Sequence, residues 1–447
     1  MKRLYSYLLI LILTLFLGQP VSAQTQMTLD DCLKYGFENN PSLKAADYGV
    51  AASEENRKSV RGQFLPSLST DYSVSPLGSM SSKGPTEDPD YLDQVTRNFS
   101  LRISQVLYAG SRIVNSYDKA KIEQEKQKAD KALAELELAY RMEATFFQLM
   151  GAKQDVKVAL ESVKNLGEGV NSARAFFEKE LISYAEVLTA EVDLANAEQQ
   201  LSIATNNVNR KRVSLFALMN MPVTETVDFS GGMDFFSKEY EKKFESCWQI
   251  AVKNRPDLNS LEQQVHMSEK DADIALGSYL PTVRLNAGYY DNDRDYDKLG
   301  SSYGRAYDRD QRNRYWSAGV SASWQLFDGG QAWYTSQKSN ITVNQIKEAI
   351  KETQLSIKEG IRKALFTIAE ADQRALGALG AVTAAEENYK VEKHRLEAGL
   401  TTIPHLLDAQ IRLTRAQGNY TQALLDYMLG RSELQFMMGE NYKMIEK

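Results

Sequence analysis

Residues 315–326 read Tyr-Trp-Ser-Ala-Gly-Val-Ser-Ala-Ser-Trp-Gln-Leu, and from Trp316 onward every second side chain is apolar. A period of two is typical of a β-strand that has one apolar and one polar face. Each stretch of this kind is close to the ~9–11 residues with which a tilted strand crosses a bilayer. Three more stretches share the pattern: 67–75, 98–107 and 282–290.

These segments predict two β-hairpins, at 65–108 and 281–327, with long polar loops at 76–97 and 291–314. Any one strand alone is better explained as a half-buried strand of a soluble sandwich. Four together in an otherwise helical chain favour strands that cross a membrane. Aromatic side chains near the strand ends suit an interfacial girdle. They are Tyr72, Phe99, Tyr108, Tyr289, Trp316, Trp324 and Phe327.

The hairpins belong to a tandem repeat. Leu107-Tyr108-Ala109-Gly110 matches Leu326-Phe327-Asp328-Gly329 at an offset of 219 residues, and Asn40-Pro41 matches Arg255-Pro256 at an offset of 215. The offset changes only once, so we interpret the chain as a duplication. The predicted division is a first repeat at 24–220, an equatorial linker at 221–245, a second repeat at 246–440 and a C-terminal tail at 441–447.

Each repeat also predicts three helices. A proline opens the first helix, where its missing N–H costs nothing. A long proline-free stretch follows the hairpin, and a return helix follows that stretch. On the return helices, apolar residues recur at alternating spacings of four and three, which is the seam of a coiled coil. The predicted helices are 41–63, 111–178 and 183–220 in the first repeat, and 256–279, 330–397 and 402–439 in the second.

The N-terminus indicates export. Lys2 and Arg3 precede the mostly apolar run 4–17, and Val21-Ser22-Ala23 forms a small-x-small cleavage pattern. We therefore predict a signal peptide at 1–23. No later stretch reaches the ~20 apolar residues of a membrane-spanning helix.

Composition excludes several function classes. The net charge of −6 gives no basic footprint for nucleic acid. The two cysteines, Cys32 and Cys247, are too few for a zinc site, and we expect buried thiols rather than a disulfide. Asp291-x-Asp293-x-Asp295 imitates a calcium loop but lacks its glycine and glutamate, so we interpret it as a polar surface loop. We predict no enzyme, metal, cofactor or nucleic-acid partner.

A chain with four membrane strands has to assemble with copies of itself. The smallest membrane barrels have about eight strands. An open sheet edge in lipid leaves backbone groups without hydrogen bonds. Strand arithmetic alone leaves a dimer, a trimer and a tetramer open.

The tandem layout, the Asn-Pro and Arg-Pro helix starts, the Leu-Phe-Asp-Gly-Gly turn at 326–330 and the Leu-Leu-Asp-Ala-Gln stretch at 406–410 resemble the TolC family of outer membrane efflux proteins, over 27–440. The resemblance implies a mainly α fold with a small β part. Long antiparallel helical hairpins form an α-barrel, and four strands per chain contribute to a trimeric 12-stranded transmembrane β-barrel.

The resemblance also implies a function. We expect a homotrimer in the cell outer membrane that contacts outer membrane lipid and extends into the periplasm. It acts as the passive exit duct of a tripartite efflux system, with a periplasmic adaptor protein and an inner-membrane pump of the RND or ABC type. The alternative is the outer-membrane component of a type I protein secretion system. A soluble periplasmic coiled-coil scaffold is the interpretation from another class.

Two sets of site residues follow from the resemblance. The periplasmic entrance constriction falls on Asp408 and His405, with Glu186 in the first repeat, and three copies of Asp408 would favour cations. A solvated coiled-coil face explains the same residues without a constriction. Glu180 stands where the second repeat has glycine, so the two tips need not be equivalent. The adaptor-contact tip comprises Gly399, Leu400, Thr401, Leu181 and Ile182.

Overall fold

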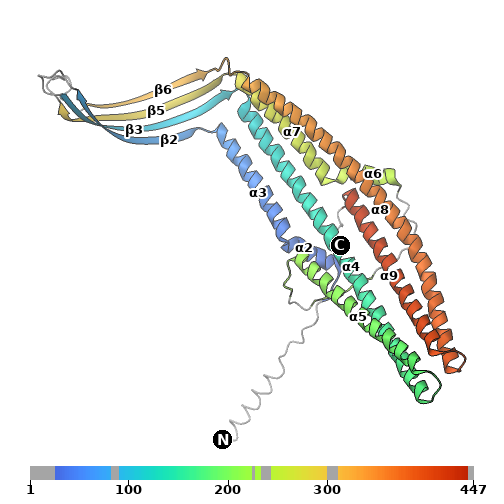
Figure 1. Cartoon of the computed structure of the whole chain (residues 1–447). Helices are drawn as coiled ribbons and strands as arrows, with labels where there is room; N and C mark the ends of the chain where they lie inside the picture. The colour runs from blue at the N-terminus through green and yellow to red at the C-terminus, as the bar shows by residue number, and fades with distance from the viewer. Residues whose placement is uncertain (1–25, 82–89, 224–226, 233–242, 300–310, 441–447) are drawn as a thin grey trace, which may run out of the picture. The chain divides into compact units, whose positions relative to one another are not determined.

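The computed structural model describes residues 26–81, 90–223, 227–232, 243–299 and 311–440. The predicted signal peptide and C-terminal tail lie outside these residues. The described chain is mainly helical with one four-stranded antiparallel sheet, which confirms the predicted fold class (Figure 1). None of the described helices combines the length and the apolar character that crossing a membrane requires.

Two helical hairpins account for most of the helical residues (Figure 1). α4 (Arg112–Glu178) runs into α5 (Tyr184–Met219), and α8 (Gln331–Glu397) runs into α9 (Ile403–Met438). The two long helices have 67 residues each and the two return helices 36 each. Their equal lengths show that both repeats build the same hairpin.

The proline-led helices also match in length. α3 (Pro41–Arg61) and α7 (Pro256–Leu276) have 21 residues each, and a single 3-10 turn follows each helix, η1 at Gly62–Phe64 and η2 at Gly277–Tyr279. The side chain before each proline ties the helix start to the end of a return helix. Asn40 Nδ2 donates to the Leu218 carbonyl over 2.7 Å, and an Arg255 guanidinium nitrogen donates to the Phe436 carbonyl over 3.0 Å.

Two short helices precede the prolines, in stretches for which the sequence pattern predicts no separate helix. They are α2 (Leu29–Asn39) and α6 (Phe244–Asn254). Thr28 and Asp31 form a capping box at the start of α2, with the Asp31 carboxylate accepting from the Thr28 amide over 3.0 Å. The Thr-x-x-Asp spacing is a sequence signal that marks this helix start.

A large apolar core lies where α2, α4 and α5 meet. The parallel pair β1 (Gln26–Met27) and β4 (Asp228–Phe229) closes its edge, and Lys153 anchors the pair by donating to Asp228 and to the Phe229 carbonyl, both over 2.6 Å. Cys32 and Cys247 are both fully buried and are not disulfide-bonded, which confirms the expectation of buried thiols. The fully buried large side chains of this core include Leu33, Met142, Phe146, Phe216 and Phe229.

The sheet has the order β2-β3-β5-β6, so the two hairpins join through β3 and β5 (Figure 1). The strands are β2 (Ser67–Ser81), β3 (Asp90–Ala109), β5 (Thr282–Leu299) and β6 (Gln311–Ser323). The prediction of polar loops over 76–97 and 291–314 is wrong for the described residues. The antiparallel backbone ladder continues into both segments, and in the second segment ion pairs such as Arg312–Asp291 join the neighbouring strands.

The register places apolar and polar side chains on opposite faces of the sheet. Residues directly opposite each other share a face. One cross-strand row is Leu68, Ile103, Ala287 and Ala318, and the row of the other face beside it is Ser69, Arg102, Gly288 and Ser317. A bulge at Leu107 shifts the alternation by one residue, so Tyr108 lies opposite Val283 on the apolar face.

The chain forms two compact units that cut across the repeats. One contains the described parts of 1–46, 131–256 and 354–447, with the ends of both helical hairpins. The other contains the described parts of 47–130 and 257–353, with the whole sheet. Each unit therefore draws on both repeats.

Candidate functional site

The apolar face of the sheet is open to the surroundings in a single chain. Its large side chains are exposed, up to 78% for Trp316. Tyr72 lies opposite Phe99, and Tyr289 lies opposite Trp316. A face of this kind buries no core and needs an apolar environment.

The predicted girdle residues lie at two levels of the sheet. The row Tyr72–Phe99 and the row Tyr289–Trp316 are neighbours on the apolar face, far from the helices. Tyr108 lies near the helix end, roughly 30 Å along β3 from Phe99 at ~3.3 Å per residue. That separation suits an apolar band about 25 Å tall crossed by tilted strands. Trp324 and Phe327 follow the end of β6, and the Trp324 indole donates to the Tyr279 carbonyl over 2.9 Å.

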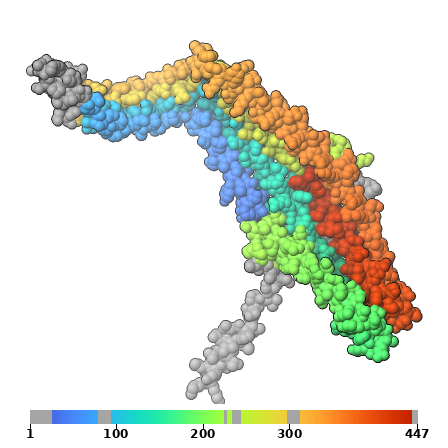
Figure 2. All heavy atoms as spheres, viewed as in Figure 1, coloured from blue at the N-terminus to red at the C-terminus, as the bar shows by residue number. Residues whose placement is uncertain are grey.

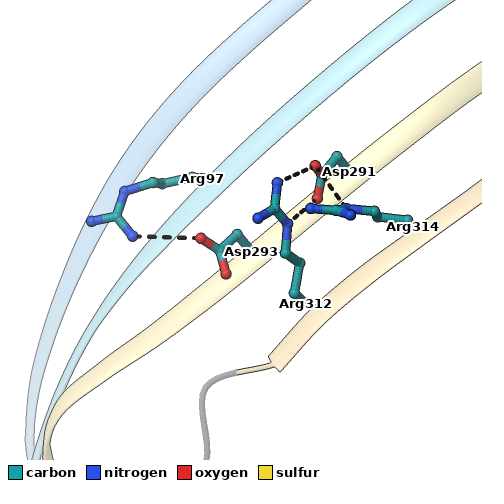
Figure 3. A network of polar contacts seen from close by, with 5 residues as sticks. All are labelled: Arg97, Asp291, Asp293, Arg312 and Arg314. Carbon is teal, nitrogen blue, oxygen red and sulfur yellow. Dashed lines mark hydrogen bonds and ion pairs between the residues drawn. The ribbon is translucent and has the colours of Figure 1, made fainter.

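Ion pairs end the apolar face (Figure 3). Asp291 accepts from Arg312 at 2.9 and 2.6 Å and from Arg314 at 3.2 Å, and its side chain is only 16% exposed. Arg97 lies 3.7 Å from Asp293 and 3.5 Å from Asp295. The interpretation of these aspartates as loop residues is therefore wrong: they stand on β5 and pair with arginines of the neighbouring strands.

The two hairpin tips share one backbone turn. Glu180 has φ +60° and Gly399 has φ +71°. The Leu181 amide donates to the Phe176 carbonyl over 3.0 Å, and the Leu400 amide donates to the Arg395 carbonyl over 2.8 Å. These are the reverse-turn bonds with which many helices end. The tips are thus equivalent in conformation although only one has glycine.

Apolar side chains project from both tips. Leu181 is 66% exposed and Leu400 is 70% exposed. Ile182 packs against the apolar cluster beneath the tips. The Thr401 hydroxyl donates to Glu392 over 2.9 Å, which fixes the second turn to α8. Each tip therefore presents one leucine on a hydrogen-bonded turn.

The three predicted entrance residues are not linked to one another. His405 and Asp408 are exposed on α9, and Glu186 is half-buried in the first turn of α5. Asp408 forms a two-nitrogen ion pair with Arg412, at 2.7 and 3.0 Å. No hydrogen bond or ion pair joins the three among the described residues. The charge of Asp408 is therefore partly neutralised within its own helix.

The two hairpins touch each other near their tips, a feature that sequence reasoning missed (Figure 2). Asn165 on α4 donates to Gln410 on α9 over 2.9 Å, and Gln410 is only 2% exposed. Gly169 leaves room for Leu407, since a Cβ there would stand 2.5 Å from a leucine methyl. Contacts between repeats leave no periodic trace in the sequence, so no signal in it pointed to this place.

A second feature was also missed, a recess of about 930 Å³ between α4, α5 and α9. Its wall mixes apolar side chains such as Val158 and Ile203 with Asp193 and Arg210. Burial raises the pKa of Asp193 above its ordinary value. The recess is formed by three helices, and the apolar pattern of one helix does not predict how that helix packs against the other two.

A half-buried carboxyl group, that of Glu143, lies between α4 and α9. Burial raises the pKa of Glu143 to about 7, although the Ser432 hydroxyl and the charge of Arg431 act in the opposite direction. No group of His, Cys, Asp and Glu side chains in the described part of the chain is arranged to hold a metal ion.

Comparisons with known proteins agree with this geometry. The family described as "Outer membrane efflux protein" matches residues 37–221 and 248–440, one match for each repeat. The outer membrane protein TolC of Vibrio cholerae is 21% identical over 438 residues, which cover 97% of this chain and 95% of that protein. The alkaline protease secretion protein AprF of Pseudomonas aeruginosa is 22% identical over 420 residues, or 90% of this chain and 82% of that protein.

The solved CmeC outer membrane channel of Campylobacter jejuni has a similar fold, with a TM-score of 0.78 and 16% identity over 94% of this chain and 87% of that one. The family comprises transport proteins rather than enzymes, and its members are trimeric channels that work with efflux systems. Both family matches cover a helical hairpin with its strands, in agreement with the repeat. The chain belongs to the outer membrane efflux protein family and is an efflux channel of the outer membrane.

Proposed function

We propose that this channel is the exit duct of a tripartite efflux system and receives its cargo through a periplasmic adaptor that docks on the hairpin tips. The observation that carries the proposal is the pair of exposed leucines, Leu181 and Leu400, on two equivalent turns. Exposed leucines on rigid turns are suited to burial by a partner, because ordering them costs little further entropy. The channel itself does no chemistry, so a separate inner-membrane pump has to supply energy and cargo.

The test is efflux by cells that carry tip variants. Leu181→Asp together with Leu400→Asp is expected to raise the accumulation of a pump substrate such as ethidium to the level of a strain without the channel. Leu379→Asp, at an exposed leucine of α8 away from the turn, is the matched control and is expected to leave accumulation unchanged. Trimers have to be present at normal levels in all strains. Normal efflux by the double variant would remove the tips from adaptor docking.

The assembly that we propose is a homotrimer in which twelve strands close one membrane barrel. Two observations support it. The sheet has two open edges, β2 and β6, which cannot stay unpaired in lipid. Its apolar face ends at aromatic rows and then at ion pairs, as a lipid-facing band does. Mass measurement in detergent is expected to give three chains, and planar bilayers are expected to show stepwise currents.

The entrance constriction stays a proposal on Asp408, His405 and Glu186. Because Arg412 pairs with Asp408, we expect Arg412→Ala to increase cation selectivity and Asp408→Ala to decrease it. Single-channel currents that both variants leave unchanged would place these residues outside the entrance.

Protein secretion is the second candidate, because the similar protein AprF is named for the secretion of a protease. Deletion of the gene separates the two functions. Loss of efflux predicts increased sensitivity to small toxic compounds, whereas loss of a secretion duct predicts one or more proteins missing from the culture medium. We favour small-molecule efflux, and a mutant that lacks a secreted protein while its drug sensitivity is unchanged would reverse that choice.

A further inference from the structure

The polar face of the sheet contains Arg284, close to the end of β5 that joins the helices. Arg284 stands between Val283 and Leu285, which belong to the apolar face, so Arg284 lies on the opposite, polar face. Its cross-strand neighbours there are Val106 and Ser321. Its side chain is exposed in the single chain.

A hollow of about 400 Å³ opens next to Arg284, where the strands meet the start of α4. The described residues that line it include no Asp and no Glu. They do include a second guanidinium and several hydroxyl groups. The polar lining residues are Ser67, Ser104, Arg112, Ser116, Thr282 and Arg284, together with Gln63.

Arg112 is held in place at the edge of this hollow. Its Nε donates to the Ala109 carbonyl over 3.0 Å, and a terminal nitrogen donates to the Thr282 hydroxyl over 2.8 Å. The Gly110 turn beside it permits a very close approach, since a Cβ on Gly110 would stand 2.2 Å from the Gly277 carbonyl oxygen. The second guanidinium is therefore fixed before any ligand arrives, which reduces the entropy lost on binding.

Other arginines of the sheet have carboxylate partners. Arg102, on the same polar face, pairs with Asp71. Arg314, on the apolar face, pairs with Asp291. Around Arg284 the hollow instead supplies the Arg112 guanidinium and the hydroxyl groups of Ser116 and Thr282. The hydroxyl groups of Ser67 and Ser104 already donate to the Ser104 carbonyl and to Asn286. No carboxylate among the described residues lines this hollow. Asp328 lines the adjoining hollow that shares Arg112, and its carboxylate accepts from the Gly330 and Ala332 amides.

We propose that this hollow is an oxyanion-binding site that takes phosphate or carboxylate groups, with Arg284 as its exposed cation. Guanidinium groups bind such groups through paired N–H donors. The proposal rests on the proposed function, in which the polar face lines the conduit of a trimer. Three copies then place three such hollows around one aqueous path, so this level of the conduit favours anionic solutes.

The experiment measures single-channel currents in planar bilayers, with inorganic phosphate as the probe and a KCl gradient for selectivity. In the wild type, phosphate is expected to reduce the current in a saturable manner. Arg284→Gln is expected to raise the half-blocking phosphate concentration at least about tenfold, because a hydrogen bond to a charged group is lost. It is also expected to shift the reversal potential toward that of a cation-preferring pore.

Two further variants make the result specific. Arg314→Gln removes the same side chain from the opposite face of the same sheet, and it is expected to leave both quantities unchanged. Arg284→Lys keeps the charge but lacks the planar fork, so we expect it to preserve the reversal potential and weaken the phosphate block.

The outcomes separate this inference from the function on which it rests. If Arg284→Gln channels conduct currents of normal size and match the wild type in both phosphate block and reversal potential, the inference is overturned and the proposed duct is not. Equal effects of Arg284→Gln and Arg314→Gln would also overturn it. A wild-type trimer that conducts no current would overturn the proposed duct itself.

Discussion

Replacing Gly399 with alanine tests how much one left-handed backbone angle contributes to the stability of the second hairpin tip. Gly399 has φ +71°, and nothing lies within 4 Å of the position that a Cβ would occupy. The substitution therefore creates no clash. Its whole cost in local stability is that of holding an L-residue in the left-handed backbone conformation, about 1–2 kcal/mol. A local loss of this size raises the population of the opened turn about 5–30-fold.

The assay is hydrogen exchange with mass spectrometry on the detergent-solubilised trimer. The Gly399 and Leu400 amides donate to Leu396 and Arg395 over 3.0 and 2.8 Å, so they report the turn directly. In Gly399→Ala these amides are expected to exchange about 5–30-fold faster. Gly380→Ala is the matched control: that glycine also has open space around it, but it is helical, and alanine there is expected to stabilise by about 0.5–1 kcal/mol.

The first tip supplies the reciprocal test. Glu180 already bears the left-handed cost at φ +60°, so Glu180→Gly is expected to slow exchange of the Leu181 amide by a similar factor. Unchanged exchange in Gly399→Ala, or the same increase in Gly380→Ala, would refute the reasoning that the turn angle limits the stability of the tip.

Three further predictions concern the unit that contains the hairpin ends. Burial raises the pKa of Glu143 from its ordinary value of 4.5 to about 7, so between these pH values the folded state holds a proton that the unfolded chain has lost. The Tm in thermal melts is therefore expected to fall as pH rises from 4.5 to 7, and Glu143→Gln is expected to abolish that pH dependence. Burial raises the pKa of Cys32 to about 12, so maleimide at pH 8 is expected to label it only after denaturation, which mass spectrometry detects. Gln410→Ala leaves the Asn165 amide without its partner, at a cost of about 1–3 kcal/mol in the stability of the contact between the hairpins. We therefore expect more frequent channel openings. An unchanged open probability would show that this contact does not hold the hairpins together.

Local chemistry marks the starts of several helices in the sequence, although α2 and α6 were not predicted. Pro41 and Pro256 begin α3 and α7, as predicted. Gly399 occupies a turn that needs a left-handed residue. Glu180 shows where this logic stops, since a residue with no preference for that angle adopts it when the surrounding hairpin requires it.

The existence of the strands could be predicted, but their ends could not. Polar residues such as Asp291 end the apolar pattern and so indicate a loop, although Arg312 and Arg314 satisfy this carboxylate across the ladder. The bulge at Leu107 and the pairing of β3 with β5 also leave no local signal. Of the site, the tip and girdle residues were named from the sequence and their roles stay predictions, whereas the Arg284 hollow arises only from long-range packing.

The order of the strands also constrains how the channel is made. The two open edges of the sheet come from opposite repeats: β2 begins at Ser67 and β6 only at Gln311. During synthesis the first edge emerges from the ribosome long before its future partner surface exists anywhere on the same chain. A chain interrupted between the repeats carries a β2 edge and no β6, so it can occupy one side of a growing ring but can never accept the next copy. In the proposed trimer, ring closure therefore requires that all three polypeptides are translated and exported past residue 323.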